Sequence, residues 1–286
     1  MKMKVLVTGA SGNVGQYVTK ALIDKGEQVV VAGTNIKKLA RMFNSDVDSV
    51  LLDFTKKDTF DNALKNVDRV FLMRPPHLGK AEDMYPFIDA MKRHQIKLVS
   101  FLSLMGIESN PIPPHYKIEK YLESSDIPFA HVRPGFFMQN LSGIHSVEIR
   151  EKNEVFVPAG NSKTSFIDAK DIGLAIATVL NNSDIHKNTT HTITGAEALD
   201  YYQIAEKLSE ITGREISYTK PGYLKYRKYY INNRGLPKAY VDVTVALYFM
   251  TRIGTAKKVT DDFFKLTGKK PRTFETFALE HLSCFQ

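Results

Sequence analysis

The sequence has almost no cysteine and no long apolar run, and each absence narrows what the protein can be. Cys284 is the only cysteine among 286 residues, which excludes a disulfide framework and a thiolate-rich zinc site. The most apolar stretches, residues 172–180 and 245–250, fall well short of the roughly 18 residues that suggest a membrane span. The three-residue apolar run near the start is too short for a secretion signal. We therefore expect a cytoplasmic protein with no membrane partner.

Acidic residues are missing from one segment, residues 216–241. The chain has a net charge of +8, and this segment supplies six of its cations and six of its tyrosines. By composition it is either a solvated helix with half-buried tyrosines or a platform for single-stranded nucleic acid. The rest of the chain carries little excess charge and no nucleic-acid motif. We therefore expect no nucleic-acid partner.

Short apolar runs alternate with amphipathic stretches through the first half of the chain. The runs are nearly continuous in Val, Leu, Ile and Phe, as in strands buried on both faces: residues 4–8, 28–33, 49–53, 67–73, 97–103 and 128–133. Helical patterns lie between them, at residues 14–26, 35–43, 58–67, 82–94 and 116–125. This alternation predicts an α/β fold with a Rossmann-type, doubly wound parallel sheet.

The pattern loosens after residue 141. A helix is predicted at 168–182, a strand at 190–195, and a helix at 200–213 that opens with an Asp-x-x-Gln capping pattern. We therefore place a sheet domain at residues 1–141 and a smaller, mostly helical portion at residues 142–286. We expect the chain to cross between them.

A glycine-rich turn, TGASGNVG at residues 8–15, stands between the first predicted strand and the first predicted helix. Its three glycines suit a tight turn, a close backbone approach to a pyrophosphate and close packing of the helix on its strand. Backbone N–H groups and the helix N-terminus then provide an anion site. This context predicts dinucleotide binding rather than a merely structural turn.

The spacing of this turn is G-x-x-G-x-x-G, and with its leading Thr-Gly it resembles the atypical short-chain dehydrogenase/reductase superfamily. Further segments resemble one branch of it, the NmrA-like NAD(P)-binding family, close to bacterial NAD(P)H:quinone oxidoreductases. These segments are VDRVFLMRPP (67–76), FLSLMG (101–106), HYKIEKYL (115–122), VRPGFFMQN (132–140), SFIDAKDIGLAIATVL (165–180), HTITGAEAL (191–199) and TGKKPRTFETF (267–277). The resemblance implies an NAD(P)-binding first domain and a substrate-side or lid portion after it.

The stretch that follows the second predicted strand, residues 32–43, contains no acidic residue to hold the ribose 2′-hydroxyl of NAD. It offers Lys37, Lys38 and Arg41 instead, which favours the 2′-phosphate of NADP(H). The alternative is that these three cations form one solvated helix face. The family often has Arg at the position of Thr34, which this sequence lacks.

Taken with the resemblance, the glycine turn implies a set of cofactor-binding residues. They are Gly9, Ala10, Ser11, Gly12, Asn13, Val14, Gly15, Thr34, Asn35, Lys38, Asp53, Phe54, Met73, Arg74, Pro75, Ser103, His115, Pro134, Phe136 and Phe137. Aromatic residues after a strand, such as Phe136 and Phe137, are equally compatible with a place in the core. The eight histidines show no metal-ligand spacing, so we expect no metal site.

Two registers compete for the catalytic position. Ser103, Tyr116 and Lys120 have the spacing of the short-chain reductase triad, in which Tyr is the general acid. When the chain is aligned from the V-R-P-G element, however, the superfamily's Lys-x-x-x-Glu pattern falls on residues 115–119 and its tyrosine on Pro111. Related quinone reductases also carry His at the Lys position. The resemblance therefore implies His115 as the catalytic candidate, with a histidine at a helix start as the alternative.

The sequence thus predicts an oxidoreductase, an NAD(P)H-dependent reductase that passes a hydride to a flat acceptor such as a quinone. The cofactor does the transfer, and the protein holds the acceptor against the nicotinamide. The alternative is a non-catalytic redox sensor that binds NADP(H) and controls a protein partner. By resemblance, the segment at 216–241 is then a lid over the nicotinamide pocket, with one or two of its tyrosines stacked on the acceptor. The candidates are Tyr226, Tyr229 and Tyr230. A homodimer is left open.

Overall fold

The computed structural model describes residues 3–43 and 47–286, which divide into two compact units. Unit 1 comprises residues 1–134, 169–193 and 261–269, and unit 2 comprises residues 135–168, 194–260 and 270–286. The sequence placed one boundary at residue 141. The structure ends the first stretch of unit 1 at Pro134 and returns two later segments to it.

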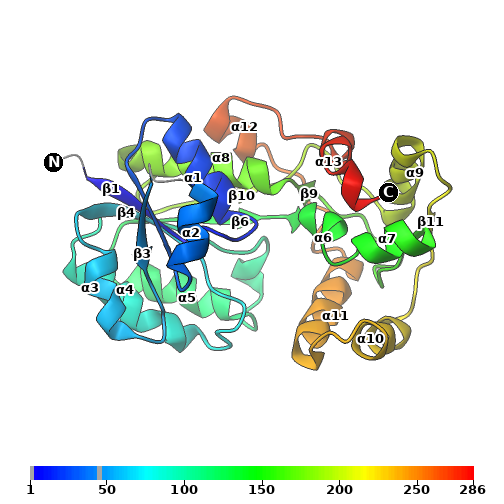
Figure 1. Ribbon diagram of the computed structural model, residues 1–286, viewed down its shortest axis with the longest axis horizontal. Helices are drawn as coiled ribbons and strands as arrows, with labels where there is room; N and C mark the ends of the chain where they lie inside the picture. Colours follow the sequence, from blue (N-terminus) through cyan, green and yellow to red (C-terminus); the bar gives the residue numbers. More distant parts are fainter. Residues whose placement is uncertain (1–2, 44–46) are drawn as a thin grey trace. The chain divides into compact units, whose positions relative to one another are not determined.

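Unit 1 is built on a seven-stranded parallel sheet with the strand order β10-β6-β5-β4-β1-β2-β3 (Figure 1). Its strands are β1 (Lys4–Thr8), β2 (Val29–Gly33), β3 (Asp48–Leu51), β4 (Val67–Leu72), β5 (Leu98–Leu102), β6 (Phe129–Pro134) and β10 (Thr189–Ile193). Strand β1 pairs with β2 and β4, so that Val7 lies opposite both Val31 and Phe71. The predicted doubly wound sheet is confirmed. The order of the strands reverses between β1 and β4, where such folds bind ligands.

Helices cover both faces of this sheet. They are α1 (Gly15–Asp24), α2 (Ile36–Phe43), α3 (Phe60–Ala63), α4 (Tyr85–Arg93), α5 (Pro114–Ser124), α8 (Ala169–Asn181) and α12 (Asp262–Thr267). One face packs on α3, α4 and α5 through a core that includes Phe87 and Ile118, and α1 and α8 pack together on the other face (Figure 1). A Cβ on Gly173 of α8 would lie 2.6 Å from the Tyr17 Cβ of α1, so glycine permits this close contact.

Unit 2 is mostly helical. Its helices are α6 (Gln139–Ser142), α7 (Ser146–Lys152), α9 (Tyr201–Thr212), α10 (Tyr223–Asn232), α11 (Lys238–Arg252) and α13 (Phe274–Glu280). Two short parallel pairs join β7 (Phe136–Phe137) to β9 (Phe166–Ile167) and β8 (Glu154–Val155) to β11 (Ser217–Tyr218).

The α9 capping pattern predicted from the sequence is confirmed. The Asp200 carboxylate accepts hydrogen bonds from the N–H groups of Tyr202 and Gln203, at 3.0 and 2.9 Å. The Gln203 side chain accepts one in return from the Asp200 N–H at 3.0 Å. Within the described ranges, no helix combines the length and the apolar character that a membrane crossing requires.

Candidate functional site

The glycine turn between β1 and α1 gives each glycine a different task. Gly9 has a φ of +58°, and a Cβ there would lie 2.7 Å from the Met73 Sδ. A Cβ on Gly15 would lie 2.3 Å from the Gly9 carbonyl oxygen, so only glycine lets α1 start on this turn. A Cβ on Gly12 would touch only that same oxygen, at 3.2 Å, which leaves the rest of its surroundings open. The turn therefore has the tight backbone and the free space that a phosphate at the start of α1 needs.

The other predicted residues of the turn frame this space. Ala10 and Val14 are buried, Ser11 is half-buried and Asn13 is exposed. The Thr8 hydroxyl ties the turn to the neighbouring strand, because it donates to the Phe71 carbonyl at 2.9 Å and accepts from the Met73 N–H at 3.0 Å. No pattern in the sequence had pointed to a role for this threonine side chain.

The loop from β2 to α2 carries the predicted ribose-side residues. Thr34 and Asn35 are exposed, and the Asn35 side chain caps α2 by accepting from the Lys38 N–H at 2.9 Å. Lys37, Lys38 and Arg41 are exposed on α2, and none of them forms an ion pair with another described residue. Their charge is therefore available to an anionic ligand at this end of the sheet.

Asp53 and Phe54 follow β3. The Asp53 carboxylate accepts hydrogen bonds from the hydroxyl and the N–H of Thr55, at 2.7 and 3.0 Å, and these bonds lower its pKa. Phe54 meets Phe87 edge-on, with ring centroids 5.2 Å apart. Both residues lie at the same carboxyl edge of the sheet as the glycine turn, the edge where parallel α/β sheets bind ligands.

Arg74 lies next to this edge, and its charge acts on the ring of His115. Arg74 follows β4, and its guanidinium donates to the carbonyls of Pro75, at 3.2 Å, and Leu78. Its Nε is buried and has no hydrogen-bond partner among the described residues. Burial lowers the pKa of Arg74, but a guanidinium stays charged at neutral pH.

His115 lies in the first turn of α5, and its ring stacks on Phe101 with centroids 5.9 Å apart. Burial and then the nearby charge of Arg74 lower the pKa of His115 to about 3, against the opposing effect of Glu119. Its Nδ1 is buried and finds no hydrogen-bond partner in the described part of the chain. A neutral imidazole with a free ring nitrogen is suited to hydrogen-bond a ligand, and it cannot act as an acid at neutral pH.

The side chains of the alternative triad, Ser103, Tyr116 and Lys120, do not make the contacts that the triad requires of them. The Lys120 ammonium lies 2.6 Å from the Glu123 carboxylate and 5.9 Å from the centre of the Tyr116 ring. The hydrogen bond that Lys120 donates to Glu123 raises the pKa of Lys120. The pKa of Glu119 is lowered against the effect of burial, first by its hydrogen bonds with Arg133 and then by His131 and by Ser103, which follows β5. Lys120 is therefore committed to Glu123, and the choice of His115 rather than Tyr116 for the catalytic position stays a prediction.

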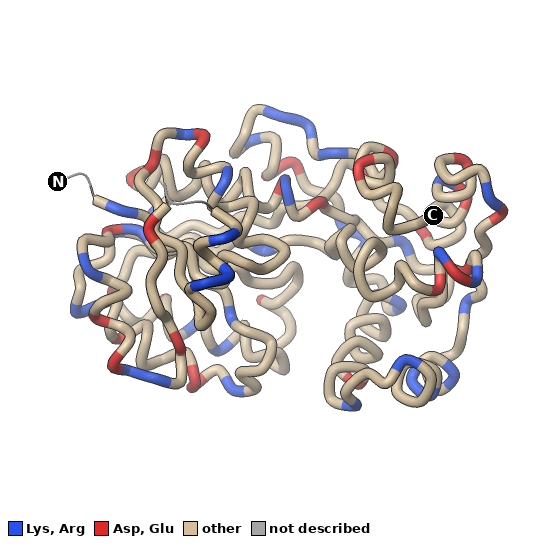
Figure 2. Tube along the Cα trace, in the orientation of Figure 1, with Lys and Arg blue, Asp and Glu red and all other residues tan. Residues whose placement is uncertain are grey.

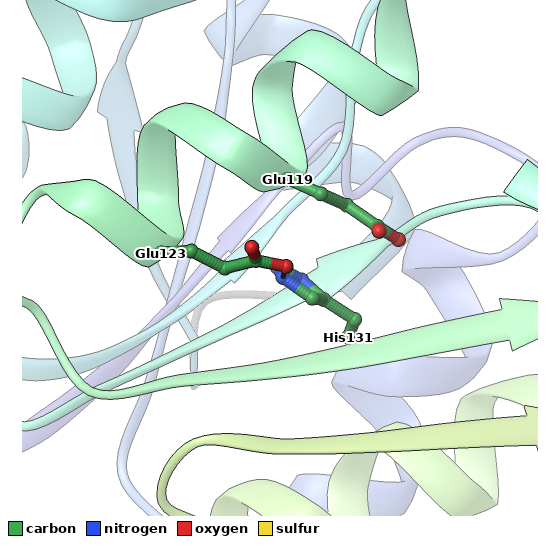
Figure 3. Close-up of side chains that lie close together, drawn as sticks. All are labelled: Glu119, Glu123 and His131. Carbon is green, nitrogen blue, oxygen red and sulfur yellow. Dashed lines mark ion pairs between the residues drawn. The ribbon is translucent and has the colours of Figure 1, made fainter. Parts of the chain in front are cut away.

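Glu119 and Glu123 of α5 face His131 of β6, and their three potential ligand atoms lie within 4.8 Å of one another (Figure 3). Arg133 already binds Glu119 through two hydrogen bonds, of 3.0 and 2.6 Å, and Lys120 pairs with Glu123. Because both carboxylates are compensated within the chain, we interpret this group as an ion-pair network. It fixes α5 against β6 and thereby positions His115 one turn earlier.

The last predicted cofactor residues divide between the two units. Pro134 ends β6, and its carbonyl accepts from the Met105 N–H at 3.1 Å. Phe136 and Phe137 form β7 in unit 2, where they are half-buried and pair with β9. That they line the cofactor therefore stays a prediction.

Two tyrosines proposed for the lid, Tyr226 and Tyr230 of α10, are buried in the core of unit 2. The Tyr230 hydroxyl donates to Glu148 at 2.9 Å and lies 2.7 Å from the His145 Nδ1. Both rings are thus packed in the core of unit 2, and Tyr230 is also hydrogen-bonded there. The prediction that they stack on an acceptor is therefore wrong.

Comparisons with known proteins agree with this architecture. The sequence model of the NmrA-like family matches residues 1–278. The chain is 30% identical to an NAD(P)H azoreductase of Xenophilus azovorans, over 98% of this chain and 99% of that protein. It is also 30% identical to the prestalk A differentiation protein A of Dictyostelium discoideum, over 99% and 93%.

Two solved structures have a similar fold. A structure of an NADPH-dependent quinone oxidoreductase from Escherichia coli, in complex with NADPH, superposes with a TM-score of 0.88 at 22% identity, over 98% of this chain and 99% of that one. A Citrobacter triphenylmethane reductase in complex with NADP(H) superposes with a TM-score of 0.86 at 21% identity, over 97% and 99%.

Proposed function

Since the chain belongs to the NmrA-like family, we propose that it is an NADPH-dependent reductase that passes a hydride to a flat, conjugated acceptor such as a quinone. The observation that carries the proposal is the glycine turn at the strand-order reversal, where Gly12 leaves open the space that a pyrophosphate would fill. NADPH would supply the two electrons and one proton of the hydride.

The residues of the chain would bind the cofactor and orient it and the acceptor. The turn would hold the pyrophosphate by its backbone N–H groups, and the α2 cations Lys37, Lys38 and Arg41 would hold the 2′-phosphate. The free Nδ1 of His115 would hydrogen-bond the nicotinamide or the acceptor. The charge of Arg74 beside it would stabilise negative charge that develops on the acceptor.

The source of the acceptor's second proton follows from the protonation state of His115. Because burial holds its pKa near 3, its imidazole has no proton to give at neutral pH beyond the N–H of the neutral ring. The reduced acceptor would therefore take its second proton from water. A quinone tolerates this, since it does not need a proton at the moment when the hydride arrives.

The relatives support catalysis over the alternative of a non-catalytic sensor. One full-length relative is named an azoreductase and another, 28% identical, is an agroclavine dehydrogenase. Both names describe redox enzymes.

NADPH oxidation tests the proposal, measured with a panel of quinones and one azo dye and corrected for the rate without protein. We expect protein-dependent oxidation with at least one acceptor. The Gly12→Val variant should lose it, because the added methyls enter the pyrophosphate space. Gly79→Val is the matched control, because no atom lies within 4 Å of a Cβ there. NADPH binding without turnover of any acceptor would favour the sensor.

A further inference from the structure

A cavity of about 340 Å³ lies within unit 2, lined by residues of α7, β8 and α10 and by Phe156 just after β8. Three of its lining residues are lysines, namely Lys152, Lys225 and Lys228, and one is acidic, Glu154. Its volume is at the lower end of the range of about 300–1,000 Å³ that is common for small-molecule sites. Its lining residues all belong to unit 2, and the glycine turn belongs to unit 1.

Two of these lysines have uncommitted charge. Neither Lys225 nor Lys228 forms an ion pair with a described residue, and both are exposed on α10, where Figure 2 shows basic residues gathered. Lys152 donates to the Tyr229 hydroxyl at 3.0 Å, so its charge is not neutralised by that contact. With Glu154 as the only acidic residue in the lining, the cavity has an excess of two positive charges.

Two aromatic rings form the apolar part of the cavity. Phe156 and Tyr229 meet edge to face, with centroids 5.0 Å apart. The Lys152 ammonium lies 4.4 Å from the centre of the Tyr229 ring, and that of Lys225 lies 5.9 Å from the centre of Phe156. Lys152 and Lys225 are thus each next to an aromatic surface, a combination that suits a ligand with a charged head and an aromatic body.

The other cations of the acid-free segment do not extend this site into a basic stripe. Arg227 pairs with Asp242 at 2.6 Å, Arg234 pairs with Glu148, and Lys220 donates to Asn161 at 2.6 Å. A polyanion such as a nucleic acid needs a continuous track of available cations. Here carboxylates neutralise Arg227 and Arg234, and Lys220 and Lys238 lie outside the lining of the cavity. Lys225 and Lys228 meet at one small cavity.

We propose that this cavity is a second ligand site of the protein, which binds a small planar aromatic monoanion such as an aryl carboxylate. The carboxylate contacts Lys225 and Lys228, and the ring lies against Phe156 and Tyr229. Glu154 adds a negative charge to the lining, and so it disfavours ligands that carry several negative charges.

The test is calorimetric titration of the whole protein with 2-naphthoate, with NADPH at saturation so that the cofactor site is filled. We expect saturable binding, and about tenfold weaker binding of uncharged 2-naphthamide, since it lacks the charge-assisted contacts. The double variant Lys225→Gln/Lys228→Gln should weaken 2-naphthoate binding by about tenfold or more. The double variant Lys257→Gln/Lys258→Gln is the matched control, because it removes the same charge from exposed lysines of unit 2 outside the cavity.

Three results would overturn the proposal. One is the absence of binding at millimolar 2-naphthoate, and another is equal binding by the two double variants. The third is displacement of 2-naphthoate by an uncharged quinone, which would assign the ligand to the acceptor site instead. None of these results depends on reductase activity, so the proposal can fail while the proposed function holds.

Discussion

His115 has an imidazole that burial keeps neutral and that lacks a hydrogen-bond partner at Nδ1 among the described residues. Such a group costs free energy in the isolated protein, because a buried polar atom without a partner loses its bonds to water. A ligand that hydrogen-bonds Nδ1 recovers this loss. The residue is therefore a better candidate for contact with the nicotinamide or acceptor than Tyr116, whose expected partner Lys120 is bound to Glu123.

We predict that His115→Ala lowers turnover by about tenfold, the equivalent of one lost hydrogen bond of about 1.4 kcal/mol. Tyr116→Phe should stay within about twofold of the wild type, since no catalytic contact is lost. Steady-state kinetics with NADPH and a quinone measure both. A large loss in Tyr116→Phe, with His115→Ala unchanged, would restore the triad of Ser103, Tyr116 and Lys120.

At the scale of elements, α2 presents Lys37, Lys38 and Arg41 with no carboxylate partner in the described residues. We predict tighter binding of NADPH than of NADH. The double variant Lys38→Gln/Arg41→Gln should weaken NADPH binding by about tenfold, the scale of a charge-assisted hydrogen bond to phosphate, and leave NADH binding unchanged.

Titration of the cofactor's own fluorescence measures both affinities, and the absence of tryptophan removes a competing signal. Raised salt should weaken NADPH binding more than NADH binding. Equal affinities of the wild type for the two cofactors, or tighter NADH, would refute the assignment of α2 to the 2′-phosphate.

Helix α10 offers a matched pair of buried tyrosines. Tyr230 donates to Glu148 and bonds His145, whereas the Tyr226 hydroxyl is not seen to hydrogen-bond any residue that the structure describes. We predict that Tyr230→Phe lowers the free energy of unfolding by about 1–3 kcal/mol, because it leaves a buried carboxylate and imidazole short of a partner. Tyr226→Phe should cost less than about 0.5 kcal/mol. Urea unfolding of both variants is the measurement, and equal losses would contradict this account.

The elements of unit 1 were predictable because local sequence determines them. Strands that are buried on both faces have nearly continuous apolar sequences, which makes their ends easy to locate. The predicted and observed bounds of β1, β4 and β6 therefore agree to within one residue. The glycine turn was predictable for a similar reason, since its backbone geometry tolerates no side chain at Gly9 or Gly15.

Other features depend on contacts between distant parts of the chain. The return of α8, β10 and α12 to unit 1 follows from packing on α1 and pairing with β6, which no local pattern encodes. The sequence shows that α10 is rich in tyrosine and lysine, but its composition does not tell which side of the helix faces the core. Tyr226 and Tyr230 face inward and Lys225 and Lys228 outward, so the segment divides its roles by face.

At the scale of the whole molecule, each unit encloses a histidine that burial keeps neutral. Burial lowers the pKa of His131 in unit 1 to about 4 and that of His145 in unit 2 to about 3. His145 is held neutral by its bonds as well. If Tyr230 donates to Glu148, its oxygen accepts from the His145 Nδ1–H, and Nε2 is left to accept from Tyr248, 2.7 Å away.

These histidines make the protein sensitive to acid. Each has a folded-state pKa below the value of 6.5 that it has when unfolded, so below pH 6.5 the unfolded chain takes up a proton that the fold excludes. The stability is therefore complete above pH 6.5 and falls as the pH falls towards 4 and 3. Between pH 7 and 5 each histidine should cost about 2 kcal/mol of unfolding free energy.

We predict that His131→Phe removes the loss of unfolding free energy that His131 causes at acidic pH, and that it changes the stability little at neutral pH. The ring of His131 is fully buried and stacks on Phe129, and among the described residues it makes no hydrogen bond of normal geometry. Its Nε2 lies 3.5 Å from the Glu123 carboxylate, but Glu123 keeps Lys120 as a partner and Glu119 keeps Arg133. Urea unfolding of wild type and variant should therefore give similar stabilities at pH 7 and a variant more stable by about 2 kcal/mol at pH 5. A difference between variant and wild type that is the same at both pH values would show that His131 takes up its proton in the folded state as readily as in the unfolded one.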